Sequence, residues 1–204
     1  MAEASTKTSK SQSQAVRNRA YIYDIVLISI SAALITVSSW ISIPIGPVPF
    51  TLQTLGILAV LLAAGGRRGT LAILVYLALG LCGVPVFSGF KGGIASFAGP
   101  TGGFLVGFAF AALVYWLLET VLFKRLMTSA VKTWIFSALN SVVFEVVMYI
   151  IGVIWFMTVY AAQTGPVGLT AVMGWCVLPF IIPDIVKIIV AVIIGERARK
   201  LVKS

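Results

Sequence analysis

Long apolar runs, separated by short polar or Gly/Pro-rich segments, constrain the fold of this chain more than any other feature. Apolar residues make up 60% of its 204 residues, charged residues make up 10%, and the mean hydropathy is +1.07. A soluble domain carries about 25% charged residues, so this balance excludes one. A helix of about 20 residues crosses a bilayer, so the chain has room for about six spans. The sequence therefore predicts an all-α integral membrane protein.

Six apolar runs predict six transmembrane helices, which we expect to form a single domain over residues 21–204. Residues 1–20 are polar and are expected to be a cytoplasmic tail. A Gly- and Thr-containing loop is expected at 163–174, and a basic amphipathic end at 196–203. The predicted spans are 21–41, 50–64, 70–82, 104–123, 134–160 and 179–194.

Basic residues are distributed unevenly among the segments that join these spans. If both termini are cytoplasmic, the inner segments hold thirteen of the fifteen Lys and Arg residues, the outer segments hold Lys91, and Lys187 lies in the sixth span. Lys and Arg are enriched in cytoplasmic loops, so both termini are predicted to be cytoplasmic. The outer segments are then the Gly/Pro-rich ones, 42–49, 83–103 and 161–178, so a pocket is expected to open outward.

Asp184 and Lys187 are the most informative ionisable residues, because charged groups within a membrane span are costly unless they are paired or hydrated. They stand three residues apart after Pro183, so both lie on one face of the sixth helix. Together they offer carboxylate acceptors and ammonium donors, an array that matches a urea or lactam. The alternative is that the two side chains only satisfy each other.

Glu145 lies in the middle of the fifth span, with Tyr149 one helical turn away. The carboxyl group is either a proton or ligand site or an acid that forms a hydrogen bond between helices. Tyr149 lines a pocket or belongs to the packed core. Asp24 and Glu119 fall near the cytoplasmic ends of their helices, so we expect them at the membrane interface.

Two predicted helix starts offer further binding groups. Thr51 and Gln53 open the second helix, where free N–H groups attract an anion, although Thr51 is also a typical capping residue. Thr101 and Gly102 open the fourth helix, where glycine permits close approach of either a ligand or a neighbouring helix. Lys91, the outer cation, either pairs with a carboxylate or lies solvated at a loop tip.

The composition also excludes several kinds of chemistry. The chain contains no histidine, so it has no histidine base and no His-ligated metal site. Cys82 and Cys176 are too far apart in sequence for a short metal-binding motif. A Walker loop and an obvious pair of nucleophile and base are both missing from the sequence. We therefore expect neither an enzyme nor a protein with a metal or other cofactor.

Four segments, in order, resemble the biotin-specific substrate-binding subunit of energy-coupling-factor transporters, the BioY type. They are Ile43-Pro44-Ile45-Gly46-Pro47-Val48-Pro49-Phe50-Thr51-Leu52-Gln53-Thr54-Leu55, the segment 80–88 with Gly83-Val84-Pro85-Val86-Phe87, Gly99-Pro100-Thr101-Gly102-Gly103-Phe104, and Pro183-Asp184-Ile185-Val186-Lys187. The resemblance covers residues 21–200, and the first and third motifs together are specific to it.

The resemblance implies a six-helix protein that captures biotin near the outer face of a bacterial plasma membrane. It implies that Asp184 accepts from the ureido N–H groups and that Lys187 donates to the ureido carbonyl. The ligand carboxylate would lie towards backbone N–H groups with Thr51 or Gln53, or towards Lys91. The other ligand-site residues implied by the matched motifs and the adjoining helices are Phe50, Phe87, Thr101, Gly102 and Tyr149.

Members of such families work with a transmembrane coupling subunit and two ATP-hydrolysing subunits. The family often has an Ala-x-x-x-Ala pair on the first helix that docks the coupling subunit. Here Ala32 is followed at that spacing by Thr36, and Ser29 with Ala33 forms a second small pair. Two alternatives keep the membrane architecture: a capture subunit for another vitamin or heterocycle, and a small proton-coupled carrier that uses Glu145 or Asp184.

Overall fold

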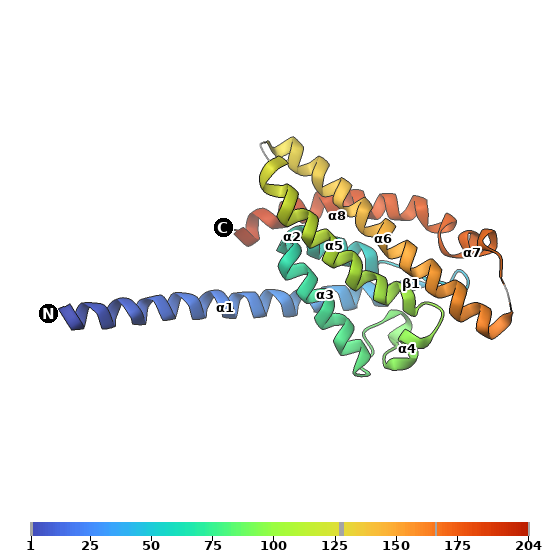
Figure 1. Ribbon diagram of the computed structural model, residues 1–204, viewed down its shortest axis with the longest axis horizontal. Helices are drawn as coiled ribbons and strands as arrows, with labels where there is room; N and C mark the ends of the chain where they lie inside the picture. The colour runs from blue at the N-terminus through green and yellow to red at the C-terminus, as the bar shows by residue number, and fades with distance from the viewer. Residues whose placement is uncertain (1, 127–128, 166, 204) are drawn as a thin grey trace.

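The computed structural model describes residues 2–126, 129–165 and 167–203, most of which are helical. Helices α1, α2, α3, α5, α6 and α8 match the six predicted spans in chain order (Figure 1). The elements are α1 (Ala2–Trp40), β1 (Ser42–Ile43), β2 (Phe50–Thr51), α2 (Gln53–Ala64), α3 (Gly66–Leu81), η1 (Ser88–Phe90), α4 (Ile94–Ala98), α5 (Gly102–Leu126), α6 (Ala130–Thr164), α7 (Leu169–Cys176) and α8 (Leu178–Lys203).

Four helical stretches in the described residues are long and apolar enough to cross a bilayer. By contrast, α2 has 12 residues and α3 has 16. At 1.5 Å per residue these helices span roughly 18 and 24 Å, less than the hydrocarbon core of about 30 Å. The protein is therefore a multi-pass helical membrane protein, and the count of six full spans stays a prediction. The four stretches are Arg17–Trp40, Gly102–Leu122, Val131–Thr164 and Leu169–Val202.

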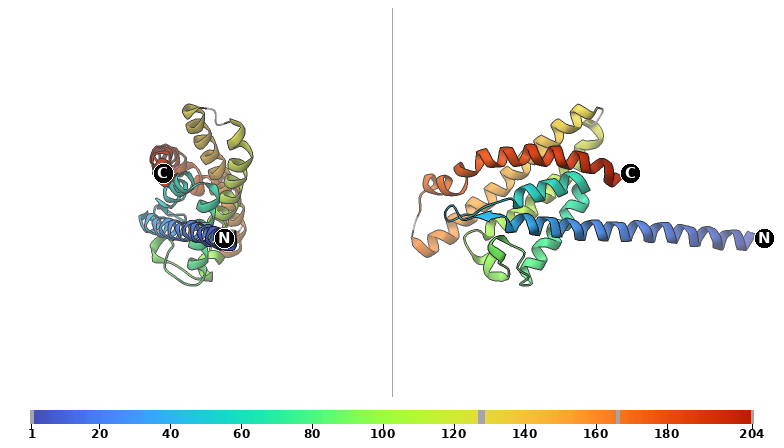
Figure 2. Two further views of the ribbon diagram at one scale, coloured as in Figure 1. Left: turned by 90° about the vertical axis from the view of Figure 1, so that its left-hand side faces the viewer. Right: turned by 180° about the vertical axis from the view of Figure 1, so that it is seen from behind.

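Two segments that the sequence assigned to a tail and a loop are largely helical. Residues 2–20 continue without a break into the first span, so α1 projects beyond the other helices (Figures 1 and 2). Most of the expected loop at 163–174 is the end of α6 and the start of α7. Residues 1–20 contain no proline or glycine, so nothing in their composition stops a helix that begins elsewhere.

The two ends of the helical bundle differ in what they carry. Both termini lie at one end in every view, whereas β1, α4 and α7 lie at the other (Figures 1 and 2). At that second end, β1 and β2 form an antiparallel hairpin that pairs Ser42 with Thr51. Two side chains of α1 hold the segment after α3: Ser39 Oγ donates to the Val86 carbonyl at 2.5 Å, and Trp40 Nε1 donates to the Pro85 carbonyl at 2.9 Å.

The opposite end is closed by a buried ionic cluster. Gly65 adopts a φ of +83°, which lets α2 turn directly into α3. Glu119 accepts a hydrogen bond from the N–H of Gly66 and forms an ion pair with Arg199 at 2.6 Å. Glu196 lies 3.5 Å from the same guanidinium group. Glu119 was expected at the membrane interface, and its partner was not predicted: α8 continues through the expected amphipathic end and brings Arg199 to it.

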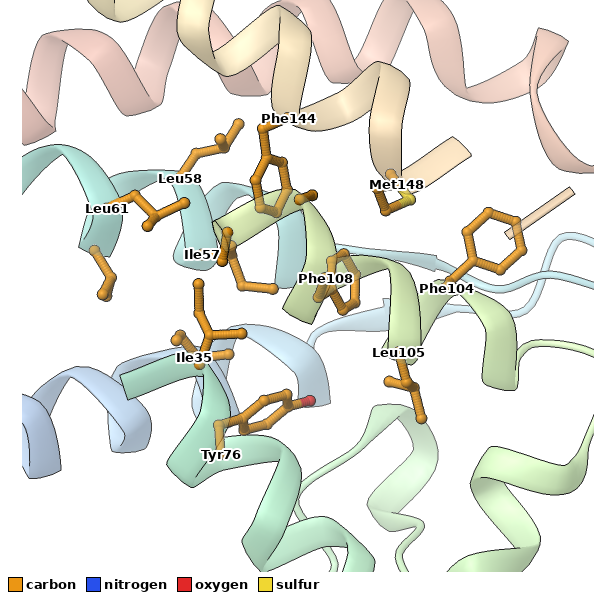
Figure 3. Packing of buried hydrophobic residues seen from close by; sticks show 14 of the residues in the cluster. Ile35, Ile57, Leu58, Leu61, Tyr76, Phe104, Leu105, Phe108, Phe144 and Met148 are labelled. Carbon is orange, nitrogen blue, oxygen red and sulfur yellow. The ribbon is translucent and has the colours of Figure 1, made fainter. Parts of the chain in front are cut away.

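The apolar core lies around α2. Helix α2 packs against α1, α3 and α8, and α5 packs against α3 and α6. Ile57 and Leu58 of α2 are fully buried near Ile35 of α1 and Phe144 of α6 (Figure 3). Outward-facing apolar side chains remain exposed on the long helices, as expected for surfaces that meet lipid. Examples are Ile30, Leu117, Leu139, Ile154 and Ile189.

Candidate functional site

A cavity of about 730 Å³ lies at the end of the bundle that carries the hairpin, α4 and α7. This volume falls in the range of small-molecule sites in proteins. The apolar core leads directly into its wall, since Phe104, Leu105, Phe108 and Met148 belong to both (Figure 3). A mostly apolar wall with few polar groups can enclose an organic molecule and fix its orientation.

The sixth and fifth predicted spans supply a buried polar group in this cavity. Lys187 Nζ lies 2.8 Å from Asp184 Oδ1, and the Tyr149 hydroxyl donates to Asp184 Oδ2. Asp184 and Lys187 are 5% and 6% exposed, and all three residues line the cavity. The two charged side chains do satisfy each other, as one interpretation of the sequence held. They also face the cavity, where a ligand with N–H and C=O groups could share their hydrogen bonds.

An aromatic ring lies against the ammonium group of Lys187. Its Nζ lies 4.4 Å from the centroid of the Phe50 ring, a distance that favours a cation–π interaction. The Phe50 ring in turn stacks on Phe180, with the centroids 6.4 Å apart. Phe50, a predicted site residue, thus acts here through Lys187 and is not itself in the cavity lining, whereas Phe180 is.

The start of α2 contributes two of the predicted residues. Thr51 and Gln53 both line the cavity, and the Thr51 hydroxyl also accepts from the N–H of Gln53 at 3.3 Å. Thr51 thus lines the cavity from β2, directly before Leu52, the residue that precedes α2. Gln53 is buried, and its Nε2 donates to the Tyr76 hydroxyl at 2.8 Å. That hydrogen bond fixes the orientation of the Gln53 amide next to the β1–β2 hairpin.

The long segment before α5 forms another wall of the cavity. Phe87, Lys91 and Thr101, three of the predicted site residues, line it. Phe87 is buried, with its ring edge against Tyr76, while Lys91 is exposed. The two residues pair across a short turn in which the N–H of Phe87 donates to the carbonyl of Lys91 at 2.9 Å. The Lys91 ammonium is thus attached to a segment anchored by a buried ring.

The prediction that Gly102 contacts the ligand is not supported by its position. Gly102 is buried against the carbonyl group of Phe97 and does not line the cavity. A Cβ atom there would overlap that carbonyl, so the glycine permits close packing of α5 on the segment that contains α4. The neighbouring Gly103 packs in the same way against the side chain of Trp155.

Sequence reasoning did not name as site residues some others that line the cavity, among them Thr54, Phe180 and Cys176. Thr54 is buried, and its hydroxyl has no hydrogen-bond partner among the described residues. It stands three residues after Thr51, a helical spacing that could have identified it. Phe180 stands one turn before Asp184 and could have been found the same way. Cys176 is buried at the end of α7, and since the helix itself was not predicted, no signal pointed to this position.

The small residues predicted to dock a coupling subunit divide into two faces of α1. Ala32 and Thr36 are buried in the protein, and the Thr36 hydroxyl donates to the Ala32 carbonyl at 2.9 Å. Ser29 and Ala33 are exposed. Of the two predicted pairs, the second is therefore the one on the outer face of α1.

These features define a helical membrane protein with a small-molecule cavity at one end of its bundle. Comparison with known proteins gives its family: the model of the BioY family matches residues 7–204, and the chain belongs to that family. It is 38% identical over 174 residues to a probable biotin transporter BioY of Pyrococcus horikoshii, covering 85% of this chain and 94% of that protein. It is 36% identical to the biotin transporter BioY of Thermotoga maritima, covering 84% and 93%.

A solved structure agrees with the family assignment. The crystal structure of the S-component for biotin from an ECF-type ABC transporter superposes with a TM-score of 0.74. The two chains are 31% identical, and the match covers 90% of this chain and 94% of that one. The resemblance found in the sequence motifs is thus confirmed.

Proposed function

We propose that this protein captures biotin in its cavity and serves as the substrate-binding subunit of an energy-coupling-factor transporter. It is a transport protein rather than an enzyme, and biotin is its transported ligand rather than a cofactor. The observation that carries the proposal is the buried pair of Asp184 and Lys187 in the cavity of a BioY-family chain.

The chemistry of the cavity suits the two polar ends of biotin. A ureido group has two N–H donors beside one carbonyl acceptor, and Asp184 and Lys187 offer the complementary acceptor and donor. The apolar walls suit the alkyl chain. For the carboxylate we favour Lys91, because the other lysine of the cavity, Lys187, is already paired with Asp184.

Binding of biotin by the purified protein tests this function. We expect native mass spectrometry to detect one bound biotin and calorimetry to give a 1:1 complex. Biotin amide, which lacks the negative charge, should bind at least about tenfold more weakly, as loss of a charge-assisted hydrogen bond implies. In a Lys91→Met variant this difference between biotin and its amide should disappear. No binding of biotin by a protein that still melts cooperatively would refute the function and favour another heterocycle.

Transport requires that the protein lie in the membrane in a defined orientation and that it bind partner subunits. We propose that the six main helices span a bacterial plasma membrane, with both termini cytoplasmic and the cavity outside. The distribution of Lys and Arg supports this orientation, and so does the location of both termini at the end away from the cavity. The partners would be a transmembrane coupling subunit and two ATP-hydrolysing subunits.

We propose the exposed pair of Ser29 and Ala33 on α1 as the contact for the coupling subunit. Small residues let two helices approach closely, so Ala33→Leu should impair biotin uptake by cells. Binding of biotin to the purified variant should stay unchanged, since the cavity is formed elsewhere. Ile30→Leu, on the same exposed side of α1, is the control for an altered lipid-facing side chain. Normal uptake by Ala33→Leu at normal expression would place the docking contact elsewhere.

A further inference from the structure

Glu145 is a buried acid to which neither the sequence nor the family assignment gives a role. It lies within α6 and is 5% exposed. Both carboxyl oxygens lack a hydrogen-bond partner among the described residues. Unsatisfied polar groups are rare and costly within a membrane protein. The side chain therefore has hydrogen-bonding capacity that the ligand-free protein leaves unused.

Two hydrogen bonds fix the register of α6 against α8. Tyr149 bonds to Asp184, and Ser137 bonds to Glu196. The two α6 residues are twelve positions apart, and so are the two α8 residues, in the opposite order along the chain. The helices thus run antiparallel in a constant register. In that register Glu145 falls level with position 188, one residue along α8 from Lys187.

The electrostatic surroundings of Glu145 point to the same neighbour. Asp184 and Lys187 are the charged groups within Coulombic reach of its carboxyl group, and both come from α8. These two form an ion pair that carries no net charge. A third group in ionised form would be an uncompensated charge at membrane depth. A carboxyl oxygen of Glu145 can accept a hydrogen bond whether or not the group is protonated.

We propose that Glu145 is a positioning residue for Lys187 in the ligand-bound state. In the empty cavity the Lys187 ammonium bonds to Asp184. When the ureido N–H groups engage the Asp184 carboxylate, the ammonium turns, donates to the ureido carbonyl, and gives another N–H to a carboxyl oxygen of Glu145. No proton is transferred in this step. The inference rests on the proposed function, because it needs a ligand that competes for Asp184.

Substitution of Glu145 tests the proposal once wild-type protein has been shown to bind biotin. Gln keeps a carbonyl acceptor of similar size, so Glu145→Gln should retain biotin affinity within about threefold. Met removes the acceptor, so Glu145→Met should weaken binding by about tenfold, as expected for a lost hydrogen bond to a charged group. Ser141→Ala, one turn further from the cavity on the same helix, is the control and should bind normally.

Two further measurements separate positioning from a structural role. The ligand-free Glu145→Met protein should melt no lower than wild type, because the carboxyl group makes no hydrogen bond to any residue that the structure describes. In a Lys187→Met background, Glu145→Met should cause no additional loss of affinity. Normal biotin affinity of Glu145→Met would overturn the proposal, and so would an equal loss of affinity in Glu145→Gln and Glu145→Met. A lowered melting temperature of the ligand-free Glu145→Met protein would also overturn it. So would a loss of biotin affinity on adding Glu145→Met to Lys187→Met that is as large as in the wild-type background. Failure of wild-type protein to bind biotin would instead refute the proposed function.

Discussion

Asp184→Asn is expected to weaken biotin binding by about 10- to 150-fold. Asp184 accepts from both Lys187 and Tyr149 inside the cavity, and a ureido ligand would add further N–H donors. A hydrogen bond to a charged group contributes about 1.5 to 3 kcal/mol, which corresponds to this range of affinity. Asn retains the shape but has one oxygen acceptor and no charge. The dissociation constant from calorimetric titration measures the effect.

The control for this measurement is the same substitution at an aspartate outside the cavity. Asp24→Asn is suitable, because Asp24 pairs with Arg68 at 2.7 Å and both side chains are about one-third exposed. This control should bind biotin like wild type. Unchanged affinity in a folded Asp184→Asn protein would exclude Asp184 from ligand binding and leave the pair with Lys187 as a purely structural contact.

Arg199→Met is expected to cause the largest loss of stability among the changes considered. The guanidinium group pairs with Glu119 and Glu196, all three side chains being mostly buried. Removal of one partner leaves buried carboxylates without compensation and costs about 3 to 5 kcal/mol. For a chain of this length that corresponds to a fall in melting temperature of roughly 6 to 20 °C. Thermal unfolding in detergent, followed by tryptophan fluorescence, measures it.

Arg197→Met provides the comparison, since Arg197 lies two residues earlier on α8 and is exposed. It should melt within a few degrees of wild type. Addition of Glu119→Gln to Arg199→Met should recover part of the stability, because one of the uncompensated charges is then removed. A melting temperature unaffected by Arg199→Met would mean that the cluster does not hold α5 and α8 together.

Much of the site could be predicted because its residues lie in short motifs or at helical spacing. Asp184 and Lys187 are three residues apart, so their common face follows from helix geometry alone. Thr51 and Gln53 lie next to a proline-rich segment that ends one helix and precedes another. The position of Gly102 outside the cavity lining could not be foreseen for a simple reason. Glycine permits close approach of any group, and the sequence does not say whether a ligand or a backbone carbonyl approaches.

Other contacts could not be predicted because they join residues far apart in the chain. Gln53 meets Tyr76, Tyr149 meets Asp184, and Glu119 meets Arg199. Each of these contacts depends on the axial register of two packed helices. A shift of one residue along a helix rotates its side chains by about 100° and would break them. Packing of the apolar helix faces fixes that register. The positions of apolar runs in the sequence, by contrast, are compatible with many registers.

The amino-acid sequence by itself determined the membrane class, the order of the main helices and the ionisable residues of the cavity. These depend on the lengths of apolar runs and on local spacing, which are properties of short segments. The tertiary structure decided that Ala32 and Thr36 face inward and that the Tyr149 hydroxyl meets Asp184. Those outcomes depend on which helix faces meet, and that is set by packing across the whole bundle.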